Sequence, residues 1–106
     1  NQQSVEEIVQ AIPKGLILIF AGVIGPIFEE GIFRVGIQAF FKPASKISIL
    51  VSSILFALVH TPTDIGSFVI YWGMGLALSW VYLRTGRFEA AVLTHFVWNV
   101  IGILML

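Results

Sequence analysis

An all-α bundle of transmembrane helices is the fold class that the sequence predicts, and three observations support it. Of the 106 residues, 58% are hydrophobic and only 11% are charged, whereas about a quarter of the residues in an ordinary soluble domain are charged. The mean hydropathy is +0.95. The apolar residues also form long segments separated by short turns that contain Pro or Gly. A polypeptide in lipid must satisfy its own backbone hydrogen bonds, and helices do so.

The polar beginning of the chain, residues 1–13, is predicted to form a short interfacial helix at about 5–12, with a frayed tail as the alternative. Ser4 and Glu7 have the spacing of a capping box that precedes an apolar run. Pro13 either ends this helix or begins the next one at its first position. Residues 14–106 are predicted to form the membrane-embedded core.

Four apolar segments follow, and together they predict a polytopic bundle of about four spanning helices. The third has no charged side chain and is long enough to cross a bilayer, the fourth is similar, and the second is short. Because Pro62 disfavours helical geometry at Thr61, His60 is expected in the last turn of its helix. The segments run approximately over residues 14–41, 46–60, 65–83 and 88–106.

The charges in the turns predict an orientation in a prokaryotic cell membrane. The second turn carries only Asp64, whereas the first and third turns carry the basic residues Lys42, Lys46, Arg84 and Arg87. In an up-and-down path these two basic turns lie on one side of the membrane. The positive-inside rule therefore places loops 42–46 and 84–87 in the cytoplasm.

Composition also restricts the classes of partner. The formal net charge is zero, which gives no basis for binding nucleic acid. The sequence contains no cysteine, which excludes disulfides and thiolate metal sites. The partner that the composition does predict is the lipid bilayer.

The most informative residues are polar side chains within the apolar segments. Such residues are costly in lipid and usually face the interior of a helix bundle, where they pair or function. Together these provide carboxylates, a guanidinium, imidazoles and a carboxamide, which are groups that hydrolytic chemistry uses. They are Glu29, Glu30, Arg34, His60, His95 and Asn99.

Helical spacing sorts the first three of these residues. Glu30 and Arg34 are four residues apart with the acid first, the better order for an ion pair on one helix. Glu29 is rotated by about 100° from Glu30 and is expected to face a different environment. Pro26 is expected to kink the helix just before Glu29 by freeing the carbonyl of Gly22. A purely structural Glu–Arg pair is the alternative interpretation.

The later polar residues form two further pairs at the same spacing. Phe56 precedes His60 by four residues, and His95 precedes Asn99 by four residues, so each pair shares a helix face. Counting inward from the basic turns at about 1.5 Å per residue places the polar residues of the three helices at similar depths in the membrane. Taken singly, His95 could be a core histidine, Asn99 a packing contact between helices, and Phe56 a packing residue.

Three motifs in this order give a resemblance to a known family. "EEGIFR" fits E-E-x-x-x-R, "FALVH" fits F-x-x-x-H, and "HFVWN" fits H-x-x-x-N. Together they resemble the CPBP family (CAAX protease and bacteriocin-processing, also called Abi) of intramembrane proteases. Known members have additional transmembrane helices, so the resemblance implies that residues 14–106 correspond to the family's catalytic core.

The resemblance implies hydrolysis of a peptide bond in a membrane-embedded or lipidated substrate, with CAAX-type prenylated proteins as one substrate class. It implies that Glu29 and His60 activate a water, that His95 and Asn99 form an oxyanion hole, and that Glu30, Arg34 and Phe56 support them. Bacterial members are linked to bacteriocin maturation, immunity and membrane-protein processing. No cofactor is required in this mechanism, which makes the enzyme a glutamic-type peptidase.

A metalloprotease is the alternative mechanism. Glu29, His60 and His95 could bind Zn²⁺ with one open coordination position. The sequence lacks H-E-x-x-H, the usual helical signature with two histidines. The metal-free glutamate mechanism is therefore favoured.

Two non-proteolytic functions also remain as alternatives. A non-catalytic immunity or scaffold protein could keep the same residues without turnover. A proton-coupled transporter fragment could also use buried Glu, His and Asn side chains. Transporters often carry an inverted repeat, and none is visible in this sequence.

Overall fold

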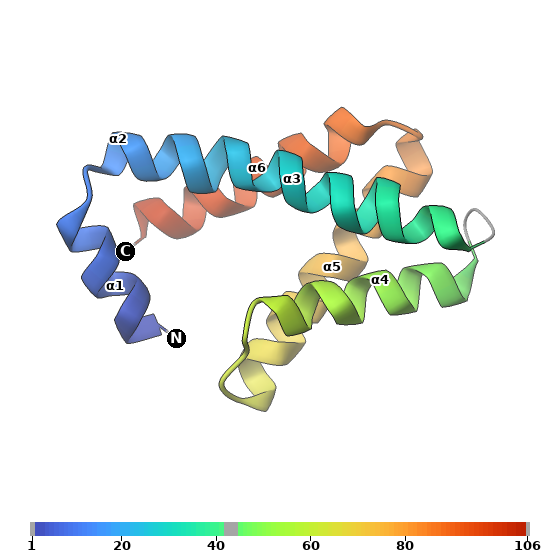
Figure 1. Cartoon of the computed structure of the whole chain (residues 1–106), viewed down its shortest axis with the longest axis horizontal. Coiled ribbons are helices and arrows are strands. Elements are labelled where there is room, and N and C mark those ends of the chain that lie inside the picture. Colours follow the sequence, from blue (N-terminus) through green and yellow to red (C-terminus); the bar gives the residue numbers. More distant parts are fainter. Residues whose placement is uncertain (1, 42–44, 106) are drawn as a thin grey trace.

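The computed structural model describes residues 2–41 and 45–105, and every regular element in that part of the chain is helical (Figure 1). The elements are α1 (Gln2–Ala11), α2 (Lys14–Ile17), η1 (Leu18–Ile24), α3 (Gly25–Glu30), η2 (Gly31–Gly36), η3 (Ile37–Phe40), α4 (Lys46–Val59), α5 (Ile65–Thr85) and α6 (Phe88–Leu104).

The elements from α2 to η3 are one continuous helical rod in which the hydrogen-bond register changes. The rod has π-helical turns in η1 and η2 and ends in a 3₁₀ turn. With 27 residues, it is one of the two described helices that are long and apolar enough to cross a membrane, and α5, with 21, is the other. The apolar helices α4 and α6 are shorter, with 14 and 17 residues. The all-helical fold is thus confirmed, while the number of spanning helices stays a prediction.

Two local expectations are wrong. Helix α1 begins at Gln2, so Ser4 lies within the helix and cannot form the predicted capping box with Glu7. Helix α4 ends at Val59, so His60 caps the helix rather than lying in its last turn. Thr61, which is restricted by the following proline, has a φ of 48°. This left-handed residue turns the chain immediately after His60.

The helices form a bundle with one arm set apart from it. Figure 1 shows α6 running alongside the first half of the rod and α4 lying close to α5, while α1 stands apart from these helices. Gly75 allows the close approach of α4 and α5, because a Cβ atom at this position would lie 3.1 Å from the Ser53 Cα. Small residues permit such approaches between helices in lipid.

The distribution of side chains is the reverse of that in a soluble protein. Large apolar side chains are exposed along every one of the longer helices. Polar groups instead occupy the interior, which suits a protein surrounded by lipid. The buried polar and charged residues are Glu30, Arg34, Gln38, Ser48, Ser52, Ser53, Ser79 and His95.

The predicted basic loops lie partly outside the described residues. Lys42 and the rest of 42–44 lie outside the described residues, and Lys46 begins α4. Arg84 and Arg87 are exposed on either side of Gly86, whose left-handed φ of 66° ends α5. The orientation of these loops relative to a membrane stays a prediction.

Candidate active site

Glu30 joins two helices through a buried cluster of charged groups. Its Oε1 lies 3.0 Å from Arg34 Nε, and both side chains have no exposed surface. Its Oε2 lies 2.9 Å from His95 Nδ1 on α6. The pairing of Glu30 with Arg34 that the spacing predicted is therefore present, and the same carboxylate also orients a histidine from another helix.

Arg34 is anchored from a third helix. Its Nη1 donates to Ser52 Oγ at 2.9 Å, and that hydroxyl donates to the carbonyl of Phe33 at 2.6 Å. The guanidinium also lies 5.1 Å from the centre of the Phe56 ring, within the range of a cation–π contact. Arg34 therefore links the rod to α4 as well as neutralising Glu30.

Glu29 lies in a different environment from the Glu30–Arg34 pair, as its rotation on the helix predicts. Its Oε2 lies 3.3 Å from His95 Nε2 and 3.7 Å from His60 Nε2. The Glu29 side chain is 34% exposed and that of His60 is 22% exposed, whereas His95 is 1% exposed. The structure therefore brings one carboxylate and two imidazoles together from the rod, the end of α4 and α6. The Glu29 Oε2 atom that faces both rings is buried and has no hydrogen-bond partner among the described residues.

The His60 ring is held by its own helix. Its Nδ1 lies 2.7 Å from the carbonyl oxygen of Phe56, and because a carbonyl only accepts, Nδ1 carries the proton. In the neutral ring Nε2 is then an acceptor directed at Glu29. Phe56 is fully buried, and its ring centre lies 4.5 Å from that of His60 and 5.7 Å from that of His95. The Phe56 ring thus packs against both histidine rings.

Asn99 bonds to a backbone carbonyl that the helix leaves free. Its Nδ2 donates to the Ala21 oxygen at 2.8 Å. In η1 the Gly25 amide bonds to the Phe20 oxygen, five residues back. In this register the Ala21 oxygen would accept from Pro26, which has no N–H. The carbonyl that Pro26 leaves free is therefore that of Ala21 and not the predicted Gly22, because the rod is π-helical here.

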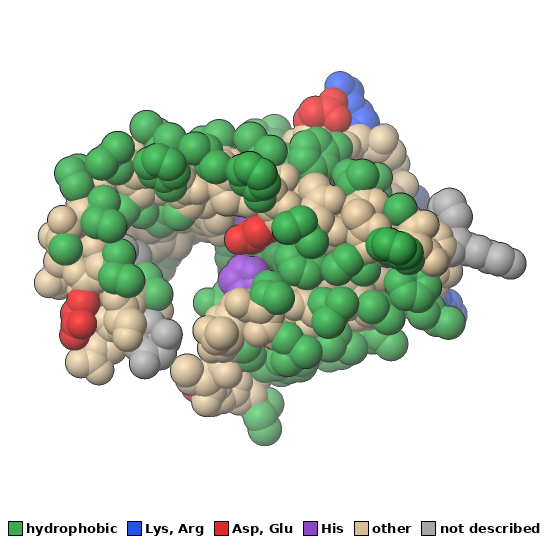
Figure 2. Space-filling model, in the orientation of Figure 1, with side chains coloured by type: hydrophobic (Ala, Val, Ile, Leu, Met, Phe, Trp, Pro, Cys, Tyr) green, Lys and Arg blue, Asp and Glu red, His purple; other side chains and the backbone are tan. Residues whose placement is uncertain are grey.

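A cavity of about 430 Å³ lies beside His60 and reaches α1. His60 and Asn99 line it, together with Gln2, Tyr71 and Trp98 among others. Figure 2 shows acidic and histidine side chains exposed at the hollow between the α1 arm and the rest of the bundle. Two of the four predicted catalytic residues, His60 and Asn99, line this cavity. Glu29 faces His60 and His95, whereas Asn99 is bonded to the backbone.

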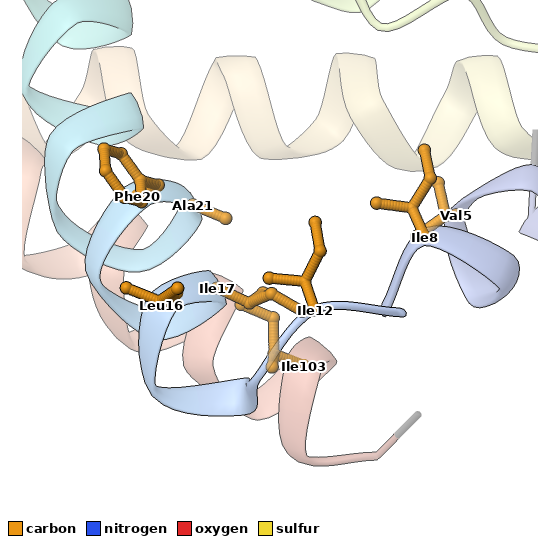
Figure 3. A pocket seen from close by; sticks show the side chains of 8 residues that line it. All are labelled: Val5, Ile8, Ile12, Leu16, Ile17, Phe20, Ala21 and Ile103. Carbon is orange, nitrogen blue, oxygen red and sulfur yellow. The ribbon is translucent and has the colours of Figure 1, made fainter. Parts of the chain in front are cut away.

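An adjoining pocket of about 510 Å³ is apolar (Figure 3). It lies between α1 and the beginning of the rod. Val5, Ala21 and Ile103 line both this pocket and the polar cavity, so the two spaces are contiguous. Its lining residues are Val5, Ile8, Ile12, Leu16, Ile17, Phe20, Ala21 and Ile103.

The described residues do not provide an evident metal site. Among residues 2–41 and 45–105, no three His, Asp or Glu side chains are arranged so that they could hold a metal ion. Glu30 is occupied by Arg34 and His95, which leaves Glu29 and the two Nε2 atoms as the donor set of the metal alternative.

Several polar residues around the site were not anticipated. Gln38 Nε2 donates to Ser79 Oγ at 3.1 Å, and Trp72 Nε1 donates to Ser53 Oγ at 3.1 Å. The spacing of Glu30, Arg34 and Gln38 in steps of four could have revealed a continuous polar face on the rod. The serines carry no comparable signal, because single serines are common in membrane helices.

An all-helical, apolar chain in which Glu29, His60 and His95 meet from three helices contains groups that hydrolytic chemistry uses. The family model described as "Type II CAAX prenyl endopeptidase Rce1-like" matches residues 12–101. The chain belongs to this family, which confirms the resemblance inferred from the three motifs.

Similar proteins occur in several bacteria. YdiL of Bacillus subtilis is 32% identical over 99% of this chain and 42% of its own length. The UPF0177 protein YvdC of Lactococcus lactis is 33% identical over 99% of this chain and 40% of its own length. The membrane-embedded CAAX protease MroQ of Staphylococcus aureus is 32% identical over 93% of this chain and 42% of its own length. The chain thus spans about two fifths of these relatives. No solved structure matches it.

Proposed function

We propose that this chain is the catalytic core of an intramembrane endopeptidase that hydrolyses a peptide bond of a membrane-associated substrate. The observation that carries the proposal is the position of the Glu29 carboxylate, which faces the Nε2 atoms of His60 and His95 at 3.7 and 3.3 Å. A carboxylate among imidazoles, partly open to water inside an apolar bundle, suits general-base activation of a water.

In the proposed reaction Glu29 and His60 bind and activate one water. Glu29 takes a proton from the water while the water oxygen attacks the carbonyl carbon of the scissile peptide bond. His60 Nε2 is available as a second acceptor because Nδ1 donates to the Phe56 carbonyl. When the tetrahedral intermediate collapses, the C–N bond breaks and the proton passes from Glu29 to the leaving amine. The products are a carboxylic acid and an amine.

His95 and Asn99 are proposed to stabilise the oxyanion of that intermediate. The Asn99 amide nitrogen carries two N–H groups, and one bond to Ala21 leaves the other for the substrate. His95 donates Nδ1–H to Glu30, so it donates to an oxyanion only when Nε2 is also protonated. Each oxyanion donor is worth about 3–4 kcal/mol.

The proposed substrate is lipidated or membrane-embedded, with a CAAX-type prenylated peptide as the first candidate. The apolar pocket that adjoins the cavity provides space for the lipid group of a substrate beside the scissile bond (Figure 3). The family description and the name of the relative MroQ point to the same substrate class. We place loops 42–46 and 84–87 in the cytoplasm. The cavity is lined by His60 and Tyr71, beside the 60–64 turn, and by Asn99 near the end of α6, so in this orientation it opens toward the opposite side of the membrane.

The test is cleavage of a fluorogenic farnesylated CAAX-type peptide by the protein in liposomes. Glu29→Gln is expected to lower kcat by on the order of 100-fold or more, because a general base contributes about that much. Asn99→Ala should lower kcat by a similar factor with little effect on KM. Glu7→Gln, in the exposed part of α1, is the matched control and should retain full activity.

A chelator distinguishes the two mechanisms in the same assay. Activity that survives chelation supports the glutamate mechanism, whereas loss on chelation and recovery with Zn²⁺ would assign Glu29, His60 and His95 as ligands. Equal activity of Glu29→Gln and wild type would refute the proposed base. If wild type cleaves neither this peptide nor any membrane protein in a comparison of cellular fragments, the chain is a binder or a transporter component.

A further inference from the structure

Tyr71 on α5 lies against the face of the His60 ring. The two ring centres are 4.7 Å apart and the planes are inclined by 24°, which is a stacked arrangement. Tyr71 also lines the 430 Å³ cavity beside His60 and Asn99. It belongs to none of the three sequence motifs, and it comes from the one long helix that contributes no other group to the Glu29 cluster.

Because His60 lies at the end of a helix, the contact with Tyr71 matters for the orientation of its ring. His60 follows the last residue of α4 and precedes Thr61, whose φ is 48°. A side chain at a helix end, beside a left-handed turn, has fewer neighbours to restrict it than one inside a helix. On the α4 side it has the Phe56 carbonyl at 2.7 Å and the Phe56 ring at 4.5 Å. From outside α4, Glu29 faces its Nε2 atom at 3.7 Å, and Tyr71 covers the face of the ring.

We propose that Tyr71 is a positioning residue that clamps the His60 imidazole against Phe56 and so directs its Nε2 atom at Glu29. The aromatic ring performs this role, and the phenol hydroxyl is not required. The proposal rests on the proposed function in assigning a purpose to the clamp, but the clamp itself is a property of the structure. Displacing a reacting group by about 1 Å can cost on the order of 100-fold in rate, so a modest rotation of His60 would matter.

Two substitutions separate the ring from the hydroxyl. Tyr71→Phe keeps the stacked ring, whereas Tyr71→Leu removes it with little change in apolar volume. Tyr82→Leu is the matched control, because Tyr82 lies on the same helix about three turns away. Circular dichroism and thermal unfolding in detergent establish that each variant folds.

The direct readout is nuclear magnetic resonance of histidine rings in isotope-labelled protein in micelles. The chain has two histidines, and a His95→Gln variant assigns their signals. In Tyr71→Leu the His60 ring-proton signals are expected to move downfield as the ring current is lost, and the preference for Nδ1–H should weaken. Tyr71→Phe and Tyr82→Leu should leave the His60 spectrum as in wild type. Unchanged His60 signals in Tyr71→Leu would overturn the proposal.

Peptide cleavage supplies the second readout. Tyr71→Leu is expected to lower kcat on the order of 10- to 100-fold with a shifted pH profile, and Tyr71→Phe should restore both. Equal losses in Tyr71→Phe and Tyr71→Leu would assign the role to the hydroxyl and refute a clamp made by the ring. If wild type cleaves no peptide, the proposed function fails, and the histidine spectra still decide whether Tyr71 holds His60.

Discussion

The Arg34 guanidinium lies at the centre of the bundle with no exposed surface, and its charge is balanced by Glu30. Arg34 Nε and Glu30 Oε1 are 3.0 Å apart but are not aligned as a hydrogen bond, so their attraction is mainly electrostatic. Glu30 then holds His95, and Arg34 holds Ser52. A buried ion pair of this kind contributes little net stability but positions the groups bonded to it.

Removal of Arg34 is expected to destabilise the protein, because it leaves the Glu30 carboxylate buried without its partner. Arg34→Leu should lower the free energy of unfolding by about 3–5 kcal/mol. Unfolding by denaturant titration in mixed micelles measures this change. Arg84→Leu, which removes an exposed arginine from the end of α5, is the control. Equal effects of the two substitutions would show that the buried pair does not matter for stability.

At the scale of the helix, the change of register in η1 connects backbone geometry to the site. Pro26 lacks the N–H that would bond to Ala21 in the π-helical register, and Asn99 takes that place. A π-helical turn inside an α-helix is frequent at functional sites. Here it ties α6 to the rod beside the cavity.

Pro26→Ala is expected to lower activity without unfolding the protein. The alanine supplies an amide that competes with Asn99 for the Ala21 carbonyl, and release of Asn99 loosens its placement in the cavity. Peptide cleavage should fall on the order of 10-fold or more while the unfolding temperature is kept or raised. The comparison with Pro13→Ala, at the start of the rod, controls for general effects of proline removal. Full activity in Pro26→Ala would contradict this role.

The beginning of α5 is capped by Asp64, whose Oδ1 accepts from the Ser67 amide at 2.7 Å. Hydrogen bonds from the Ser67 backbone and side chain lower the pKa of the Asp64 carboxyl. A lowered pKa means that the stabilisation is present above the unfolded-state pKa and is lost as the pH falls through the folded-state pKa.

The difference in unfolding temperature between wild type and Asp64→Ala is therefore expected to be constant near neutral pH and to shrink in acid. Asp64→Asn is the control, because asparagine also caps helices but does not titrate here. A difference that stays the same down to the lowest pH at which the protein folds would show that the charge of Asp64 does not stabilise the cap.

For the whole molecule, an apolar exterior and a polar interior dominate. Phe28 and Phe40 are 68% and 87% exposed, whereas Glu30 and Arg34 are fully buried. Such a surface is stable when lipid covers it. The charged residues lie at the site, at or near the turns, and on the exposed helix α1, which carries Glu6 and Glu7. The direction in which the site faces depends on how the turns are placed across the membrane.

The orientation can be tested with single cysteines, because the chain has none of its own. In intact bacterial cells an impermeant thiol reagent should label Thr63→Cys and should label Thr85→Cys only after lysis. The physical reason is the positive charge of Arg84 and Arg87, which retains that turn in the cytoplasm. Labelling of Thr85→Cys in intact cells would reverse the proposed orientation.

Composition and helical spacing alone predicted the all-helical fold, which the structure confirms, and the candidate site residues, whose catalytic roles stay a prediction. Spans without charges require helices in lipid, and the few polar residues in those spans stand out because burying them is costly. The spacing of Glu30 and Arg34 also indicated which glutamate is neutralised, since residues four apart share a face. These inferences rest on local geometry, and the structure agrees with them.

Tertiary packing determined which atoms of the candidate site contact one another. That His95 bonds to Glu30 as well as facing Glu29, that Asn99 bonds to the Ala21 carbonyl, and that Tyr71 stacks on His60 all depend on how distant helices cross. A one-dimensional pattern contains the residues of a site, but contacts between helices determine which atoms meet.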